Sequence, residues 1–195
     1  MRQGQGKSWK KVPGLWLMTD ERVGDVDLLR TIARLPRGSA VVFRHYSLPE
    51  SERRALFDQV ARAAHRRHVL VLLAGDPVMA RDWGADGHHG RTGRPFRTRR
   101  DWLHSAPVHD HRELVAARRV GADVLLVSPL FATRSHPGAR LLGPARFAAL
   151  AREASVPVIA LGGVKKRHAS CARALGASGY AAIDGLTVRP TRTSC

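Results

Sequence analysis

A Gly-Ala pair followed by a small polar residue recurs three times, each time between a helical pattern and an apolar run. The three copies are Gly84-Ala85-Asp86, Gly121-Ala122-Asp123 and Gly176-Ala177-Ser178. Glycine readily adopts the left-handed conformation that ends a helix, after which the chain can turn into a strand. The repeat therefore predicts a chain in which helices alternate with parallel strands.

Short runs of apolar or small residues supply the predicted strands, and helical patterns lie between them. The strands are expected at residues 15–19, 40–44, 69–73, 87–89, 105–108, 124–127, 158–161 and 180–183. The helices are expected at residues 49–67, 77–83, 110–119, 144–154 and 167–175. Three of them begin with a helix-start signal: Ser47 before Glu50, Asp76 before Pro77, and Asp110 before Glu113.

Eight strands within 195 residues predict an α/β fold, a small single-domain (β/α)8 TIM barrel, and fit it better than an open doubly wound sheet. We expect the barrel to span residues 15–186, between a flexible basic tail at 1–14 and a C-terminal tail at 187–195. Few residues follow Leu186, so the last helix is expected to be reduced or missing. A second subunit could cover the apolar surface left there, which makes a homodimer a possible assembly.

The chain carries 33 Lys and Arg against 16 Asp and Glu, a net charge of +17, which attracts polyanions in general. The arginines are spread along the predicted helices, and no nucleic-acid-binding module is recognised, so we expect no nucleic-acid partner. The longest apolar run, residues 69–74, is too short to span a bilayer. We therefore expect no membrane span and a cytoplasmic protein.

Two predicted strands break directly into residues that leave backbone amides open to a ligand. The first break falls within residues 124–138 and the second within residues 156–164. Gly162 and Gly163 precede two lysines at a predicted helix start, and such a bend can bind a phosphate through its N–H groups. The alternative is that the paired glycines only turn the chain.

Further motifs follow one another from residue 15 to residue 186, and their order and spacing carry more information than any one of them. They are Leu15-Trp16-Leu17-Met18-Thr19-Asp20, Arg44, Gly84-Ala85-Asp86-Gly87 with His89, His109, Gly121-Ala122-Asp123, Pro129 with Phe131 and Thr133, Gly138 and Gly143, Pro157 to Gly163, and Gly176-Ala177-Ser178-Gly179. Together they resemble the thiamine phosphate synthase/TenI family.

The resemblance implies small phosphorylated thiamine precursors as ligands. A synthase of this family couples hydroxymethylpyrimidine diphosphate to thiazole phosphate, releasing pyrophosphate with the help of Mg2+, whereas a TenI-type tautomerase moves a proton on thiazole carboxylate phosphate. The resemblance suggests catalytic roles for Arg44 and His109. The expected phosphate-binding residues are Gly162, Gly163, Thr133, Arg134, His136 and Asp184.

Several positions depart from the family pattern. Asp184 stands where a serine is common, and a carboxylate would repel the phosphate unless it turned toward Lys165 or Arg44. Asp76 is the one carboxylate left for magnesium, which prefers several oxygen ligands.

A group of arginines, Arg91, Arg94 and Arg97, could bind the diphosphate in place of the missing ligands. A synthase-like transferase, a tautomerase using His109 and a non-catalytic thiazole-phosphate-binding barrel all stay open. The nearby histidines His88, His89, His104 and His111 match no known metal-ligand spacing.

Overall fold

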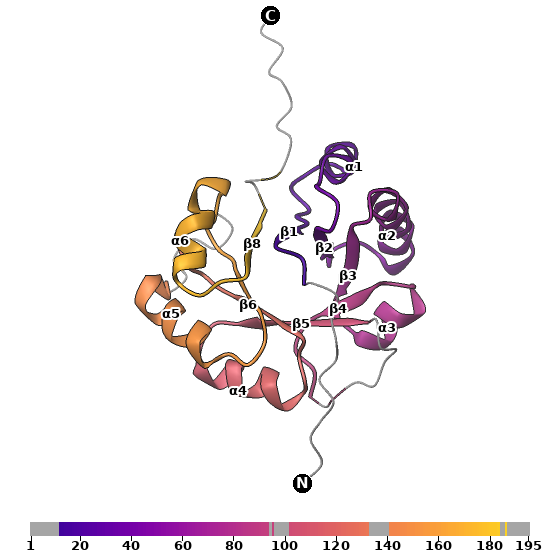
Figure 1. The fold of residues 1–195 in the computed structure, drawn as a ribbon. Coiled ribbons are helices and arrows are strands. Elements are labelled where there is room, and N and C mark those ends of the chain that lie inside the picture. Colours follow the sequence, from indigo (N-terminus) through magenta and orange to yellow (C-terminus); the bar gives the residue numbers. More distant parts are fainter. Residues whose placement is uncertain (1–11, 94, 96–101, 133–140, 184–185, 187–195) are drawn as a thin grey trace, which may run out of the picture.

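Eight parallel strands close into one barrel in chain order, with β8 pairing back to β1 (Figure 1). The computed structural model describes residues 12–93, 95, 102–132, 141–183 and 186. The strands are β1 (Leu15–Met18), β2 (Ala40–Phe43), β3 (Leu70–Ala74), β4 (Gly87–His89), β5 (Leu103–Val108), β6 (Val124–Val127), β7 (Val158–Ala160) and β8 (Gly179–Ala182). The helices are α1 (Asp25–Ala33), α2 (Glu50–His65), α3 (Pro77–Asp82), α4 (His111–Arg119), α5 (Gly143–Glu153), the short 3-10 turn η1 (Lys166–His168) and α6 (Ala169–Ala174).

The core has two layers because successive strand residues point to opposite sides of the sheet. In β2, Ala40 and Val42 belong to the cluster that fills the barrel, while Val41 and Phe43 pack outward against the helices. The inner cluster is dominated by Leu, Val, Ile and Ala, and Trp16 is its largest member. Strands buried on both faces explain the nearly continuous apolar runs of the sequence.

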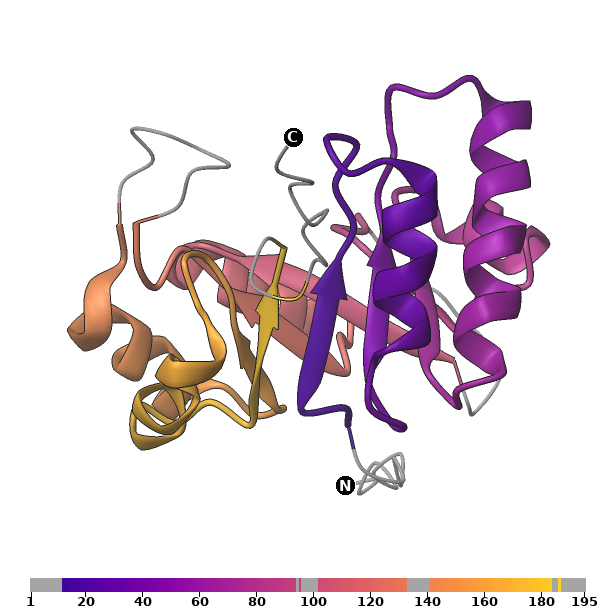
Figure 2. The same cartoon turned by 90° about the horizontal axis from the view of Figure 1, so that it is seen from above.

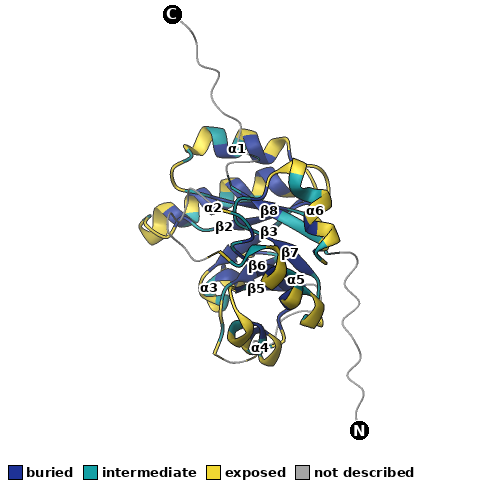
Figure 3. Cartoon of the chain, turned by 90° about the vertical axis from the view of Figure 1, so that its left-hand side faces the viewer, coloured by how far each residue is buried: buried dark blue, intermediate teal, exposed yellow. Residues whose placement is uncertain are grey.

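The helices surround the strands, and their outer surfaces are exposed (Figure 3). Each strand runs toward one end of the barrel, which we call the mouth, and the following helix returns to the other end, which we call the back face. Figure 2 shows β1 pointing toward the mouth while α1 and α2 lie beside it. The loops after the strands therefore meet at the mouth, and the helix C-termini meet at the back face.

The turn signals of the sequence are confirmed at most positions. Gly84, Gly121 and Gly176 follow the ends of α3, α4 and α6 with φ of 73°, 71° and 97°. The Asp76 side chain caps α3 by accepting from the Val78 N–H. Asp110 caps α4 by accepting from the Glu113 N–H at 2.9 Å.

Three sequence-based expectations are corrected. Ser47 does not cap α2: its hydroxyl and N–H bind Glu21 instead, and Pro49 precedes the helix. The helix α1 was not predicted, although Leu28 and Ile32 are spaced by one helical turn and both are buried. The segment expected as one helix at 167–175 divides into η1 and α6.

Part of the expected architecture lies outside the described residues, including most of the tail segments and the place of the last helix. Within the described ranges, no helix separates β4 from β5. None of the described helices is both long and apolar enough to cross a membrane.

Gly87 provides a test of the packing of β4. A Cβ atom at this position would lie 2.0 Å from the carbonyl oxygen of Leu103 on the neighbouring strand, so Gly87→Ala should destabilise the barrel by about 3 kcal/mol or more. Urea unfolding followed by circular dichroism measures this. The control is Gly24→Ala, because Gly24 has φ of −61° and no atom within 4 Å of an added Cβ; equal losses in the two variants would contradict the packing argument.

Candidate active site

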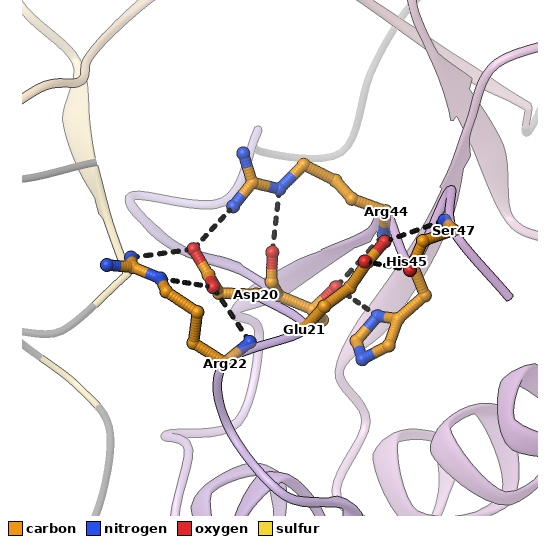
Figure 4. Close-up of polar contacts among 7 residues, drawn as sticks. Asp20, Glu21, Arg22, Arg44, His45 and Ser47 are labelled. Carbon is orange, nitrogen blue, oxygen red and sulfur yellow. Dashed lines mark hydrogen bonds and ion pairs between the residues drawn. The ribbon is translucent and has the colours of Figure 1, made fainter. Parts of the chain in front are cut away.

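The loops after β1 and β2 place an acidic and a basic side chain together at the mouth. Asp20 follows β1, and its carboxylate accepts hydrogen bonds from Arg22, at 2.7 Å from Nε and 2.8 Å from Nη2. These bonds lower the pKa of Asp20 from 3.8 to about 2. Arg44 follows β2, and its Nη2 lies 3.5 Å from Asp20 (Figure 4).

Arg44 is held mainly by Thr19. Its Nε donates to the Thr19 carbonyl at 2.6 Å, and its backbone N–H donates to the Thr19 hydroxyl at 2.9 Å. Burial is the main effect on the Arg44 guanidinium and lowers its pKa. Within the described part of the chain, Nη1 has no hydrogen-bond partner, so this end of the side chain can receive an anion.

A buried arginine on α2 fixes the ends of two strands. Arg53 donates to the carbonyl of Arg44 at 2.9 Å and to the carbonyl of Ala74, the last residue of β3, at 2.8 Å. Its guanidinium also lies 5.3 Å from the ring centroid of Tyr46 and 5.5 Å from that of Trp83. The loops that carry Arg44 and Asp76 are thus held by one cation.

His89 lies at the end of β4, on the inner side of the barrel according to the strand alternation. The hydroxyl of Ser105 on β5 is 2.9 Å from its Nδ1. Burial lowers the pKa of His89 to about 3, and the nearby Arg44, His104 and His109 act in the same direction. The ring is therefore neutral at pH 7 and lies near both predicted catalytic residues. From the sequence, His89 is a motif residue and one of four nearby histidines that match no metal-ligand spacing, and it has no predicted role at the mouth.

His109 follows β5, and a carboxylate orients its imidazole. The Glu113 Oε2 lies 2.8 Å from His109 Nδ1 and also accepts from the His109 backbone N–H at 2.8 Å. Arg91 forms an ion pair with the other oxygen of Glu113. A histidine held at Nδ1 by a carboxylate can exchange a proton at Nε2. His109 also lines a groove of about 500 Å³ between α4 and α5.

The bend after β7 packs closely against the loop after β6. A Cβ at Gly162 would lie 2.7 Å from Pro129, and one at Gly163 would lie 2.3 Å from the Ala132 carbonyl oxygen. The glycines therefore have a packing role at this bend, whether or not the bend also binds a phosphate. In the described part, the N–H groups of Gly163 and Val164 have no backbone acceptor, whereas the Lys165 N–H donates to His168 Nδ1 at 3.2 Å.

The described donors do not fit a magnesium ion. Asp76 is exposed and uses one oxygen to cap α3. Among the residues that the structure describes, no three His, Cys, Asp or Glu side chains gather as metal ligands.

Several predicted ligands of the phosphate groups lie outside the described residues. They are Thr133, Arg134, His136 and Asp184, together with Arg94 and Arg97 of the arginine loop.

A second histidine of β4 faces the outer layer. His88 is fully buried and stacks between Trp102 at 5.2 Å and His104 at 4.1 Å, measured between ring centroids. Neither of its ring nitrogens has a hydrogen-bond partner among the residues that the structure describes. Burial lowers the pKa of His88 to about 3.

The fold and its mouth define a (β/α)8 barrel whose strand ends carry cationic and imidazole groups. The chain belongs to the thiamine monophosphate synthase family, whose model matches residues 15–186. It is 34% identical over 190 residues to a relative from Geobacter sulfurreducens, covering 90% of this chain and 87% of the relative. It is 29% identical to the thiamine-phosphate synthase of Thioalkalivibrio sulfidiphilus, covering 93% of this chain and 90% of that protein.

Solved structures agree on the fold. Thiamine phosphate pyrophosphorylase from Pyrococcus furiosus superposes with a TM-score of 0.72 at 21% identity, covering 89% of this chain and 86% of that one. The comparisons thus confirm the barrel and the family that the sequence motifs predicted.

The Asp20 carboxylate should make folding sensitive to acid. Its pKa in the folded protein is about 2, against about 3.9 in an unfolded chain, which corresponds to about 2 kcal/mol of stability at neutral pH. That contribution is complete above pH 4 to 5 and is lost as the pH falls toward 2. Asp20→Asn should therefore cost about 2 kcal/mol at pH 7 and progressively less in acid. Unfolding by urea from pH 7 to pH 3 measures the difference.

The matched control is Asp58→Asn, which removes an exposed ion pair with Arg54 on α2 and should cost less than about 1 kcal/mol. An Asp20→Asn deficit that did not shrink in acid would contradict this account.

His88 should weaken the native state. Replacing it with Phe keeps a ring between Trp102 and His104 and removes two buried nitrogens that have no partner. We expect His88→Phe to raise the free energy of unfolding by about 1–2 kcal/mol at pH 7. The gain should grow below pH 6.5, because the unfolded histidine binds a proton there and the buried one does not until about pH 3.

Urea unfolding at pH 7 and pH 5 tests this. His104→Phe is the control, since His104 Nε2 has a partner in the Gly90 carbonyl at 3.2 Å. Destabilisation by His88→Phe at both pH values would show that the ring nitrogens are not the source of the cost.

Proposed function

We propose that this chain is a thiamine-phosphate synthase-type transferase, which joins hydroxymethylpyrimidine diphosphate to thiazole phosphate and releases pyrophosphate. The membership of residues 15–186 in the family supports this proposal. The structural observation that supports it best is the position of Arg44. Thr19 holds this side chain at the mouth, and among the described residues one of its guanidinium nitrogens has no partner. A cytoplasmic location and a homodimer remain predictions.

In this reaction the bond between the pyrimidine methylene group and the diphosphate breaks, and negative charge develops on the leaving diphosphate. Arg44 is placed to stabilise that charge, since a guanidinium pairs well with phosphate oxygens. Because Thr19 and Asp20 fix its side chain in advance, little reorganisation is needed when the charge appears. The N–H groups of Gly163 and Val164 are the proposed contacts for the thiazole phosphate, together with Gly162 and the predicted Thr133, Arg134 and His136.

Magnesium is the metal that the family resemblance implies for the synthase. The described carboxylates do not form a site for it: Asp20 and Glu113 are bound by arginines, and Asp76 caps α3. We therefore assign no step to a metal. Arginine side chains are the proposed counter-charges for the diphosphate.

A second function is favoured by one specific observation, the His109–Glu113 contact. A TenI-type tautomerase needs one group that removes a proton from the thiazole carboxylate phosphate and returns it at another atom. His109 has Nδ1 fixed by Glu113 at 2.8 Å, which leaves Nε2 for this transfer. This function needs no diphosphate site. The absence of a magnesium-binding carboxylate cluster among the described residues is therefore compatible with it.

A substrate assay separates the two functions. With both synthase substrates and magnesium, we expect thiamine phosphate and pyrophosphate to form, and Arg44→Gln to lower kcat/KM by about a hundredfold. His109→Asn should have a smaller effect. Arg54→Gln, on the outer surface of α2, is the control, and circular dichroism verifies that each variant is folded.

Two other outcomes of the assay would replace the synthase proposal. If no coupled product forms, and the protein instead exchanges a thiazole proton in a reaction that His109→Asn abolishes, the tautomerase replaces the synthase. Calorimetric binding of thiazole phosphate with neither reaction would leave a non-catalytic binding barrel.

A further inference from the structure

The back face of the barrel carries a cluster of arginines with no acidic partner. We call Arg34, Arg37, Arg66 and Arg67 the back patch. Arg34 and Arg66 are the first residues after α1 and α2, and Arg37 and Arg67 lie in the turns that lead to β2 and β3. All four side chains are exposed.

Hydrogen bonds hold the two turns of the back patch side by side. The Gly38 N–H donates to the His68 carbonyl at 3.0 Å, and Arg67 Nη2 donates to the Leu35 carbonyl at 3.4 Å. The two turns that carry the back patch are therefore neighbours in space, although they are about thirty residues apart in the sequence. Exposed positive charges on adjoining turns add to one local field that attracts anions.

Within the described ranges, none of the four arginines forms an ion pair. Asp86 follows α3 on the same face, but its Oδ2 is already 2.8 Å from His65 Nε2 and accepts from the Val71 N–H at 2.8 Å. Two arginines of the mouth do contact carboxylates, since Arg44 lies beside Asp20 and Arg91 beside Glu113. The back patch thus carries four positive charges for which the described residues supply no carboxylate.

The helix dipole accounts for only part of this arrangement. A cation at the last turn or the cap of a helix is stabilised by the exposed carbonyl groups, and this applies to Arg34 and Arg66. Arg37 and Arg67 lie beyond the helix ends, where the dipole has little effect. Exposed arginines also lie in the last turns of α4 and α6: Arg118, Arg119 and Arg173.

Among the described residues, the large exposed apolar side chains lie at the other end of the molecule. Val26 and Val78 are in the first turns of α1 and α3, Tyr46 follows β2, and Leu141 precedes α5, so all of these large exposed side chains are near the mouth. A protein partner usually needs an apolar centre in its interface. The back patch offers charge without such a centre, and this favours a phosphate backbone over a protein surface.

We infer that the back face binds nucleic acid through its phosphates, without reading the base sequence. Arginine suits this partner because its guanidinium group can contact two phosphate oxygens at once. The site is separate from the mouth, so this binding does not depend on the proposed catalytic function. The sequence predicts no nucleic-acid partner, because its arginines are spread along the helices and no recognised module is present. The spacing of residues does not show that two helix ends bring four exposed arginines onto adjoining turns.

Fluorescence anisotropy with a labelled 20-base-pair DNA duplex tests the inference at several salt concentrations. Wild-type protein should bind near 50 mM salt, with affinity falling steeply as salt increases. The triple variant Arg37→Gln, Arg66→Gln, Arg67→Gln should bind at least about tenfold more weakly, and its salt dependence should decrease by about 0.9 in log–log slope for each arginine that contacts a phosphate.

The matched control removes the same charge elsewhere. Arg112 and Arg146 are exposed in the first turns of α4 and α5, and Arg167 is exposed in η1, so all three follow the mouth ends of strands. The variant Arg112→Gln, Arg146→Gln, Arg167→Gln should therefore retain nearly wild-type binding. Equal weakening in the two triple variants would overturn the inference, because overall charge would then explain the binding. Absence of duplex binding at 50 mM salt, or tighter binding to polyglutamate or to phosphatidylglycerol vesicles than to the duplex, would overturn it as well.

Discussion

The pairing of β8 with β1 is the contact on which the rest of the molecule depends. Tyr180 donates its N–H to the Gly14 carbonyl at 3.0 Å, and a Cβ at Gly179 would lie 2.2 Å from that same oxygen. Glycine at position 179 lets the last strand approach the first closely enough to close the sheet. Closure brings the ends of β1, β2, β4 and β5 around one mouth, so Asp20, Arg44, His89 and His109 share a site although they are far apart in the chain.

Much of the fold could be predicted because its signals are local. The glycines after the helices and the Asp76 and Asp110 caps depend on neighbouring residues, and apolar runs mark strands that are buried on both sides. Two errors have a different origin. Ser47 has a suitable sequence for a cap, but Glu21 on the neighbouring loop binds its hydroxyl. The helix α1 follows Gly24 and has no side-chain cap, so the sequence offers no start signal for it.

The site was less predictable because its residues are positioned by distant partners. The sequence pointed to Arg44 and His109, but not to Thr19 and Glu113, which hold them. The family resemblance also supplied no sign that Asp20 is already occupied by Arg22. His89 was visible as a motif residue, yet its neutral state depends on burial and on nearby cations from other strands. Such effects come from the three-dimensional arrangement and leave no pattern in the spacing of residues.

Arg53 links two loops that would otherwise move independently. It binds the carbonyl oxygens at the ends of β2 and β3, and no carboxylate accepts its charge among the described contacts. A displacement of either strand end would remove one of these two acceptors from a buried cation, so Arg53 couples the positions of the two ends. A change in ligand specificity achieved by reshaping only the β3 loop would therefore also shift the arginine that follows β2, and the two loops would have to evolve together.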